Sequence, residues 1–324
     1  MNRSAFVAGS VALAVCRPRP AAAAVDAAYS VAVASGTLYG TLLVPGGGLP
    51  VPAVLIIGGS GPTDRDGNST LGLKSDAYKL LAAALFARGV ASLRYDKRGV
   101  GASTGALSDE SKVRFEDLAA DAGAWLTKLR ADPRFGAIAI AGHSEGSLIG
   151  MLTALQTQAD AFVSLEGAGF PAADGLRRQT QAALAGQPDL LAANDRILTA
   201  LANGETSLSV PDQLAPLYRA SVQPYLISYF RYDPRIEITK LTCPVTIVQG
   251  TADFQVLVDD AKALAAASPA AKLDIVAGLT HPLKHVDDPS RRNQLATVYT
   301  DPEIPIDAAV PAAVEAAARM GAAA

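Results

Sequence analysis

The sequence predicts an α/β domain with a mostly parallel sheet covered by helices on both faces. Short aliphatic runs alternate with helical segments from residue 53 to residue 165, and the same rhythm resumes at residue 244. The run at 53–57 is aliphatic without interruption, as a strand of a parallel sheet is when both of its faces are buried. The chain has 324 residues, which is enough for one large domain of this kind.

Each element is expected from its own pattern. The alternating segments 29–34 and 37–44 predict an antiparallel hairpin at the start of the fold. The segment 75–88 has helical periodicity and ends at Gly89, a C-terminal stop, before the strand predicted at 90–95. The remaining strands are predicted at 53–57, 137–141, 161–165, 244–249 and 272–277, and the remaining helices at 115–130, 144–156 and 308–320.

Between the strands at 161–165 and 244–249 the alternation is interrupted. Residues from about 170 to 238 are helical and amphipathic in pattern, with proline and glycine breaks and no strand-like run. We interpret this segment as a helical cap inserted into one domain, which would extend from 25 to 324. A cap in this position would lie over the carboxyl edge of the sheet, where open α/β sheets bind ligands.

The first 24 residues have the pattern of a secretory signal peptide. Arg3 gives a positive start, residues 5–16 are apolar, and four alanines follow at 21–24. The apolar stretch is too short to span a bilayer in the mature chain. A secreted or periplasmic protein is therefore expected. Removal of Cys16 with the leader would leave Cys243 without a partner, so no intrachain disulfide is expected.

Composition excludes several classes of function. The chain is 50% hydrophobic and 18% charged, with a formal net charge of −3, which gives no reason to expect nucleic acid or an anionic membrane as partner. No metal or other cofactor is expected either. Asp64, Asp66 and Asn68 have the spacing of a calcium loop, but Ser75 stands where the bidentate glutamate would be. A hydrogen-bonded turn is the better interpretation.

The segment from Gly142 to Gly146 is the strongest functional signal. It reads Gly-His-Ser-Glu-Gly and lies between the apolar run at 137–141 and the next helix. Strand, turn and helix in this order form the nucleophile elbow, a strained turn that exposes a serine hydroxyl. The elbow brings strand and helix close together, so both flanking positions must be small. We therefore predict Ser144 as a catalytic nucleophile.

A serine nucleophile needs a histidine base, and the chain contains three histidines. His143 flanks the serine and is expected to point away from it. His281 follows the strand at 272–277, at the carboxyl edge of the sheet, and is the predicted base. His285, four residues further on, is the alternative.

The base in turn needs a carboxylate to orient it. Asp253 comes directly after the strand at 244–249 and is the predicted acid. Asp259 and Asp260 are alternatives, but they fall on the following helix and are expected to be solvated. The order Ser144, Asp253, His281 along the chain is the order of such triads on one α/β fold.

Backbone donors for the oxyanion are expected from two places. One is the N–H of Glu145, at the start of the elbow helix. The other is the glycine-rich loop after the strand at 53–57, where the N–H of Ser60 is preferred and that of Gly59 comes next. A phosphate-binding role of this loop is disfavoured, because it lacks the ending of a P-loop and the spacing of a dinucleotide fingerprint.

Other polar and aromatic residues have less specific interpretations. The charged run at 96–98 either binds an anionic substrate or supports the elbow, and the second role is preferred. Glu145 and Glu166 could be general acids, although backbone and packing roles suffice for both. Four aromatic residues stand at roughly helical spacing in the cap segment: Tyr225, Tyr229, Phe230 and Tyr232. The sequence allows two roles for them, lining an acyl pocket or packing the cap on the sheet, and does not decide between the two.

Together these motifs resemble the α/β-hydrolase superfamily, and within it bacterial esterase-like proteins with a Gly-Ser-Gly-Pro-Thr-Asp-Arg-Asp-Gly-Asn loop. That loop stands here at 59–68, and the resemblance covers about residues 29–320. Many relatives have His-Gly where this chain has Gly58-Gly59. The other matching segments, in order, are 95–103, 142–146, 250–253 and 278–281.

The resemblance and the triad imply a serine hydrolase that cleaves small carboxylic esters, with short- to medium-chain acyl groups, through an acyl-enzyme. A peptidase, amidase, thioesterase or lactonase would use the same triad on another bond. A non-catalytic binding protein that kept the fold is the alternative of another class, but the three triad residues are all present.

Overall fold

A computed structural model describes residues 26–48, 50–207 and 209–321. Its centre is an eight-stranded sheet with the order β1-β2-β4-β3-β5-β6-β7-β8, in which pairs from β4 onward are parallel and the first two pairs are antiparallel. The strands are β1 Ala27–Val33, β2 Gly36–Leu43, β3 Val51–Ile57, β4 Ala91–Tyr95, β5 Phe135–His143, β6 Ala161–Leu165, β7 Val245–Gly250 and β8 Lys272–Val276.

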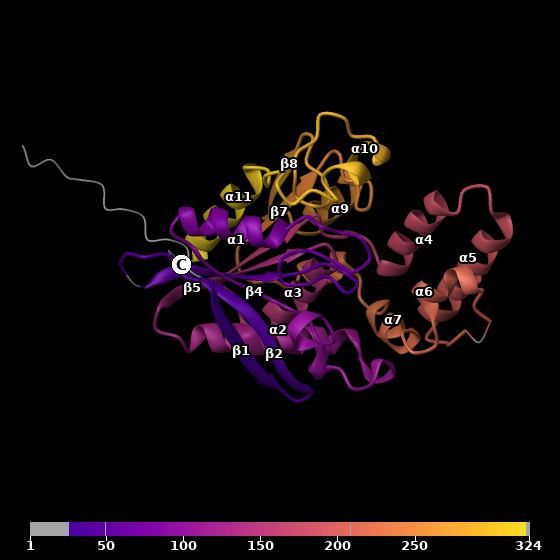
Figure 1. The fold of residues 1–324 in the computed structure, drawn as a ribbon, viewed down its shortest axis with the longest axis horizontal. Coiled ribbons are helices and arrows are strands. Elements are labelled where there is room, and N and C mark those ends of the chain that lie inside the picture. Colours follow the sequence, from indigo (N-terminus) through magenta and orange to yellow (C-terminus); the bar gives the residue numbers. More distant parts are fainter. Residues whose placement is uncertain (1–25, 49, 208, 322–324) are drawn as a thin grey trace, which may run out of the picture.

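Helices cover both faces of the sheet (Figure 1). One face packs against α1 (Ala77–Ala87) and α11 (Ala309–Gly321), and the other against α2 (Phe115–Arg130), α3 (Glu145–Thr157) and α9 (Val258–Ala267). The central strands are apolar on both sides because each face has its own helical layer. In β3, for example, Val54 and Ile56 join the core under α1 and α11, while Leu55 and Ile57 join the core under α2 and α3.

Five α-helices of the described chain lie between β6 and β7, and we call them the cap helices. They extend beyond the sheet at one end of the molecule (Figure 1). Their own apolar core includes Ile197, Leu198, Leu201 and Tyr218. The bounds are α4 Ala172–Ala183, α5 Pro188–Ala202, α6 Ala215–Tyr218, α7 Gln223–Tyr229 and α8 Pro234–Ile238, and α10 (Arg291–Ala296) follows later in the chain. Short 3₁₀ helices occupy Gly101–Ala106, Glu110–Lys112 and Asp212–Leu214.

The predicted fold class is confirmed, and most predicted elements lie within two residues of their observed bounds. The helix predicted from residue 75 begins at Ala77, because Asp76 has a left-handed backbone with φ 49°. Within the described part of the chain, no helix is both long and apolar enough to cross a bilayer. The predicted signal peptide, residues 1–24, lies outside the described residues, so secretion stays a prediction.

Candidate active site

Ser144 lies in a strained turn between β5 and α3. Its backbone has φ 54° and ψ −123°, which a non-glycine residue adopts only when the surroundings enforce it. The glycines on either side allow this. A Cβ on Gly142 would lie 2.2 Å from the carbonyl oxygen of Gly146, and a Cβ on Gly146 would lie 2.3 Å from that of Ile57. The Gly-x-Ser-x-Gly spacing is therefore a steric requirement of this turn.

The predicted base and acid meet at the carboxyl edge of the sheet. The His281 Nδ1 and the Asp253 Oδ2 are 2.6 Å apart, and both side chains are buried. The other carboxylate oxygen, Oδ1, accepts hydrogen bonds from the backbone N–H groups of Gln255 (2.7 Å) and Val256 (3.1 Å). These donors favour the charged carboxylate and fix its orientation. Asp253 thus presents one oxygen to the imidazole.

Ser144 and His281 line the same small cavity, of about 100 Å³, together with Gly59, Ser60 and Tyr78. Among the hydrogen bonds of the described residues, none joins the Ser144 hydroxyl to His281. Such a bond often tightens only once substrate is bound. The structure thus brings the three predicted residues to one place, Ser144 and His281 at one cavity and Asp253 behind His281.

His143 was predicted to point away from the nucleophile, and this is wrong. Its ring lies 4.7 Å from the ring of His281, centre to centre, and lines the same cavity as Ser144. The Nε2 is 2.8 Å from the carbonyl oxygen of His281, and the Nδ1 is 2.7 Å from the hydroxyl oxygen of Tyr78. Because a carbonyl can only accept, Nε2 carries the proton and Nδ1 accepts from Tyr78. His143 therefore holds the loop of the base in place.

The buried environment keeps His143 neutral, and this predicts a pH effect on stability. Burial, and then the proximity of His281, lower the pKa of His143 to about 3. Below the ordinary pKa of histidine, the His143 ring of the unfolded chain binds a proton, whereas in the folded chain it stays neutral down to about pH 3. Stability is thus lost as the pH falls through this window, by up to about 1.4 kcal/mol per pH unit.

We expect His143→Gln to flatten that slope, as measured by urea unfolding at several pH values across the window. The same change at the exposed His285 is the control. An unchanged slope in His143→Gln would contradict the assignment of a neutral His143.

The oxyanion donors can be compared directly. The N–H of Gly59 donates to the hydroxyl oxygen of Tyr78 at 2.9 Å, so this second choice for the donor is already engaged. The N–H of Ser60 has no acceptor among the described hydrogen bonds, and the residue faces the cavity of Ser144. The N–H of Glu145 is the first of α3, where backbone N–H groups are unpaired and the helix dipole favours negative charge. Ser60 and Glu145 thus stay the candidate pair.

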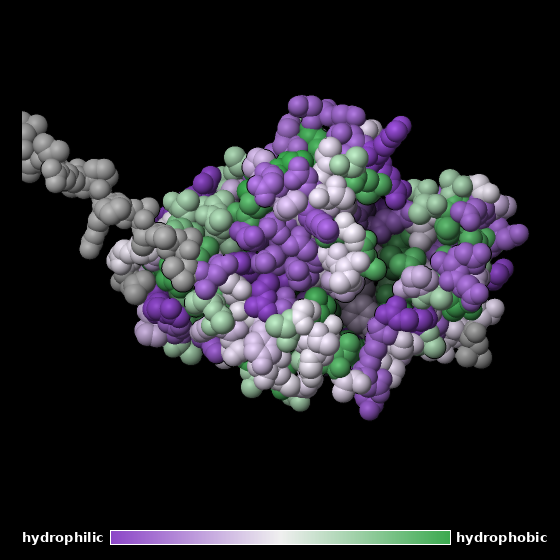
Figure 2. Space-filling view, in the orientation of Figure 1, coloured by the Kyte–Doolittle hydropathy of each residue, from purple (hydrophilic) through white to green (hydrophobic). Residues whose placement is uncertain are grey.

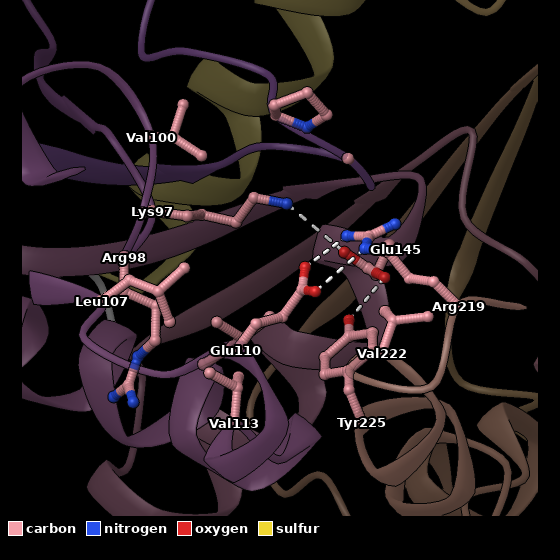
Figure 3. A pocket seen from close by; sticks show the side chains of 14 residues that line it. Lys97, Arg98, Val100, Leu107, Glu110, Val113, Glu145, Arg219, Val222 and Tyr225 are labelled. Atoms are coloured by element: carbon pink, nitrogen blue, oxygen red, sulfur yellow. Dashed lines mark hydrogen bonds and ion pairs between the residues drawn. The ribbon is translucent and has the colours of Figure 1, made fainter. Parts of the chain in front are cut away.

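A second cavity, of about 300 Å³, lies beside the elbow on the side of these donors (Figure 3). The Glu145 side chain forms its floor between Lys97 and Tyr225, at 3.4 Å from the Lys97 Nζ and 2.7 Å from the Tyr225 hydroxyl. Glu110 and Arg219 pair at its rim. Apolar side chains form the walls, among them Val100, Leu107, Val113, Leu118 and Val222.

A third cavity lies on the side of the base, between α4 and α10. It shares Gln255 and Tyr299 with the cavity of Ser144, and its walls include Phe254, Leu257 and Leu295. Leu257 and Leu295 are exposed. Figure 2 shows this region as a hollow between the cap helices and the rest of the molecule. The second cavity thus adjoins the elbow at Glu145, and the third adjoins the cavity of Ser144 at Gln255 and Tyr299.

Asp259 and Asp260, the alternative candidates for the acid, make contacts with residues other than His281. Asp259 is exposed, as predicted, but Asp260 is fully buried, and the expectation that it is solvated is wrong. It accepts from the N–H of Gly169 at 3.0 Å and pairs with Arg178 of α4 at 2.9 Å. Asp260 therefore ties a cap helix to α9. Its amphipathic helix gave no sign of this contact, which joins residues far apart in the chain.

The charged loops near the elbow are held by hydrogen bonds. The Asp64 Oδ1 accepts from the N–H groups of Asp66 and Asn68 at 2.9 Å each, and Asp66 pairs with Arg94 at 2.7 Å. No group of potential metal ligands is found among the described residues. In the run at 96–98, Asp96 pairs with Arg65, Lys97 donates to the carbonyl of Gly59, and Arg98 pairs with Asp121.

The four aromatic residues of the cap divide between the two roles that the sequence left open. Tyr225 lines the second cavity. Tyr229 stacks on Phe115 of α2 with ring centres 4.2 Å apart, and Tyr232 donates to Glu116. Phe230 belongs to the core of the cap. Tyr225 is therefore the one of the four that faces a cavity.

Solved structures with the same architecture identify the fold. Est1E of Butyrivibrio proteoclasticus superposes with a TM-score of 0.59 at 20% identity, over 92% of this chain and 99% of that one. The chain has the α/β-hydrolase fold. Proline iminopeptidase of Mycobacterium smegmatis shares it as well, with a TM-score of 0.57 at 14% identity, over 92% and 99% of the two chains.

Sequence comparisons agree with a hydrolase. Residues 71–186 match the family described as "Serine aminopeptidase, S33". "Esterase EstD" of Thermotoga maritima is 27% identical over 237 residues, which cover 69% of this chain and 52% of the relative. The chain thus spans about half the length of that esterase. The closer resemblance carried by the loop at 59–68 stays a prediction.

Proposed function

We propose that this α/β-hydrolase cleaves carboxylic esters through an acyl-enzyme on Ser144. The observation that carries the proposal is the 2.6 Å contact between His281 Nδ1 and Asp253 Oδ2, at a cavity that the strained Ser144 also lines. The order of the three residues along the chain is that of a serine triad on this fold, and the contact between the base and the acid supports the assignment. The homology to an esterase supports the choice of the ester bond.

The reaction follows from the donors and acceptors in place. His281 takes the Ser144 proton on Nε2 as the hydroxyl oxygen attacks the ester carbonyl, and Asp253 stabilises the resulting imidazolium. The N–H groups of Ser60 and Glu145 stabilise the oxyanion. The imidazolium then gives its proton to the departing alkoxide. Water, activated by His281, attacks the acyl-enzyme, and the acid is released as Ser144 recovers its proton.

The same chemistry assigns the two cavities. The leaving alcohol receives its proton from His281, so it must lie on the side of the base, where the third cavity adjoins Gln255 and Tyr299. The acyl group then extends to the other side, past the oxyanion donors, into the second cavity. Its volume of about 300 Å³ is at the small end of ligand pockets. This supports short- to medium-chain acyl groups.

The charges in the second cavity, the proposed acyl-side cavity, favour an ester over an aminoacyl substrate. An aminopeptidase must neutralise the substrate ammonium with an available carboxylate. Here Glu145 is held by Lys97 and Tyr225, and Glu110 by Arg219. Both carboxylates are already matched by a cation, so a second cation would have to displace one of these partners. An aminopeptidase is thus less favoured than an esterase. A peptidase or thioesterase that uses the same triad is the second candidate.

Hydrolysis of p-nitrophenyl esters of increasing acyl length, beside a panel of aminoacyl-naphthylamides, tests the proposal. We expect ester turnover that falls for long acyl chains and little release of naphthylamine. Turnover of the naphthylamides at higher kcat/KM than any ester would overturn the ester assignment in favour of the peptidase.

Narrowing the acyl-side cavity tests which side holds the acyl group. Val222 lies on its wall. Val222→Phe is expected to lower kcat/KM for hexanoate at least about 10-fold while acetate changes little, since a misfit of one methylene is worth about 1–3 kcal/mol. Leu295→Phe, on the wall of the third cavity, is the matched control. It should instead discriminate against bulky alcohols. The reverse pattern would exchange the two assignments.

A further inference from the structure

A second carboxyl group lies buried behind the triad. Glu166 follows β6 directly, and its carboxyl accepts from the N–H of Gly250, the last residue of β7, which Asp253 follows. The Glu166 and Asp253 carboxyl groups therefore lie near each other, close enough for each to affect the pKa of the other. Glu166 has 0% of its surface exposed. Its backbone has φ 49°, and its N–H donates to the carbonyl oxygen of Val248 in β7 at 2.9 Å. The reaction described above does not use this residue.

The remaining contacts of Glu166 are all with hydrogen-bond donors. The N–H of Gly250 lies 2.9 Å from Oε1 and 3.1 Å from Oε2, and the side-chain amide of Gln249 donates to Oε2. No lysine or arginine in the described chain forms an ion pair with Glu166. Two ionised carboxylates that lie near each other repel, so one of the two carboxyl groups is expected to hold a proton.

The surroundings decide which group holds the proton. Asp253 has three donors, the His281 ring and the N–H groups of Gln255 and Val256, and it faces the group that becomes an imidazolium. Glu166 has the amide donors of Gln249 and Gly250 and faces no cation. The negative charge is therefore better placed on Asp253.

We propose that Glu166 is a positioning residue of the triad, a neutral carboxylic acid whose O–H donates to Asp253 and holds that carboxylate toward His281. This inference rests on the proposed function, because it gives Asp253 and His281 their triad roles. Glu166 acts through Asp253 and touches no reacting atom.

The titration of the pair agrees with this geometry. Burial, followed by the charge of Asp253, raises the pKa of Glu166 well above its ordinary value. Burial alone would raise the pKa of Asp253 as well, but His281, Glu166 and the N–H of Gln255 lower it. The other titratable groups around the pair are His143, which is neutral, and Tyr299, whose pKa is raised by burial. Neither supplies a positive charge to an ionised Glu166.

A neutral Glu166 matters for catalysis because the site then holds one negative charge. When His281 takes the proton of Ser144, that charge is balanced by a single imidazolium. Asp253 keeps its second oxygen toward the ring because Glu166 and the backbone N–H groups occupy its other acceptor positions. Loss of the O–H would leave a buried acceptor position unsatisfied and free the carboxylate to turn.

The rate at which a fluorophosphonate labels Ser144, measured against pH, tests the proposal without knowledge of the natural substrate. Glu166→Gln keeps one donor and one acceptor without a charge. Its labelling rate, and the pH below which that rate falls (the acid limb of the profile), should stay close to those of the wild type. Glu166→Leu removes the donor, and labelling should slow by about 10- to 100-fold, since small misplacements in an active site cost up to about 10². Glu237→Gln, a buried glutamate of α8 paired with Lys240, is the matched control.

Two results would overturn the proposal. Glu166→Leu that folds and is labelled as fast as the wild type would show that the hydrogen bond has no effect on the triad. An acid limb moved about one pH unit or more to lower pH in Glu166→Gln would show that a charge had been removed. If the wild type itself is not labelled, the proposed function fails instead, and the two failures are thus distinct.

Infrared difference spectroscopy supplies a readout that does not depend on activity or on Glu166→Leu folding. At neutral pH the wild type should show the carbonyl band of a protonated carboxylic acid that is missing in Glu166→Gln and present in Glu237→Gln. A wild-type spectrum that loses only carboxylate bands on the change to Gln would contradict a neutral Glu166.

Discussion

Replacement of Ser144 by alanine is expected to lower kcat for p-nitrophenyl acetate by about 10⁴-fold or more. The serine oxygen is the atom that forms the acyl-enzyme, and in serine proteases removal of the nucleophile leaves only the contribution of binding and of the oxyanion donors. Alanine keeps the Cβ, and the turn at φ 54° is as accessible to alanine as to serine. Stability, measured by thermal unfolding, should therefore change little.

The control for this change is Ser209→Ala, at an exposed serine between the cap helices α5 and α6. It should hydrolyse the ester at the wild-type rate. Burst kinetics give a second check, because the wild type should release one equivalent of nitrophenol ahead of the steady state when deacylation is slow. Turnover in Ser144→Ala within about 10-fold of the wild type would rule out an acyl-enzyme on Ser144, and a wild type no faster than buffer would favour a binding protein that kept the fold.

The parts of this fold that the sequence predicted well are those with a local cause. The strand at 53–57 is predictable because both of its faces are buried, which removes polar residues from the run. The elbow was found for a steric reason, since the backbone oxygens of Gly146 and Ile57 leave no room for a Cβ on either flanking glycine. Asp253 and His281 were found because each follows a strand of the sheet at the same edge.

What the sequence did not predict depends on contacts between distant segments. Asp260 and Arg178 are 82 positions apart, and nothing in the periodicity of either helix indicates that the aspartate is buried. The roles of His143 and Glu166 depend on the backbone of His281 and the side chain of Asp253, which reach them only through the folding of the sheet. Tertiary burial, rather than residue type, decided these cases.

The substitution Asp253→Asn is expected to lower kcat for p-nitrophenyl acetate by about 10⁴-fold, because of the way in which Asp253 is held. The carbonyl oxygen of the asparagine must replace Oδ1, because the N–H groups of Gln255 and Val256 point at that position. Its NH₂ group then faces the Nδ1 of His281 in place of Oδ2. Nδ1 can only accept from it, so the ring proton moves to Nε2, and the nitrogen that should take the proton of Ser144 is already protonated. In a serine protease the wrong tautomer has an effect of this size.

Asp259→Asn is the matched control, since that carboxylate lies on the surface and its ion pair within the described residues is with Lys262, a contact worth little in water. Kinetics of p-nitrophenyl acetate hydrolysis and proton NMR of the His281 ring, which reports the position of the ring proton, measure both variants. Asp253→Asn with a normal tautomer and near-normal kcat would show that the carboxylate does not orient the base. We expect the altered tautomer and the low kcat instead, because the N–H groups of Gln255 and Val256 allow the asparagine one orientation. In that orientation the Nε2 of His281 is protonated and cannot take the proton of Ser144.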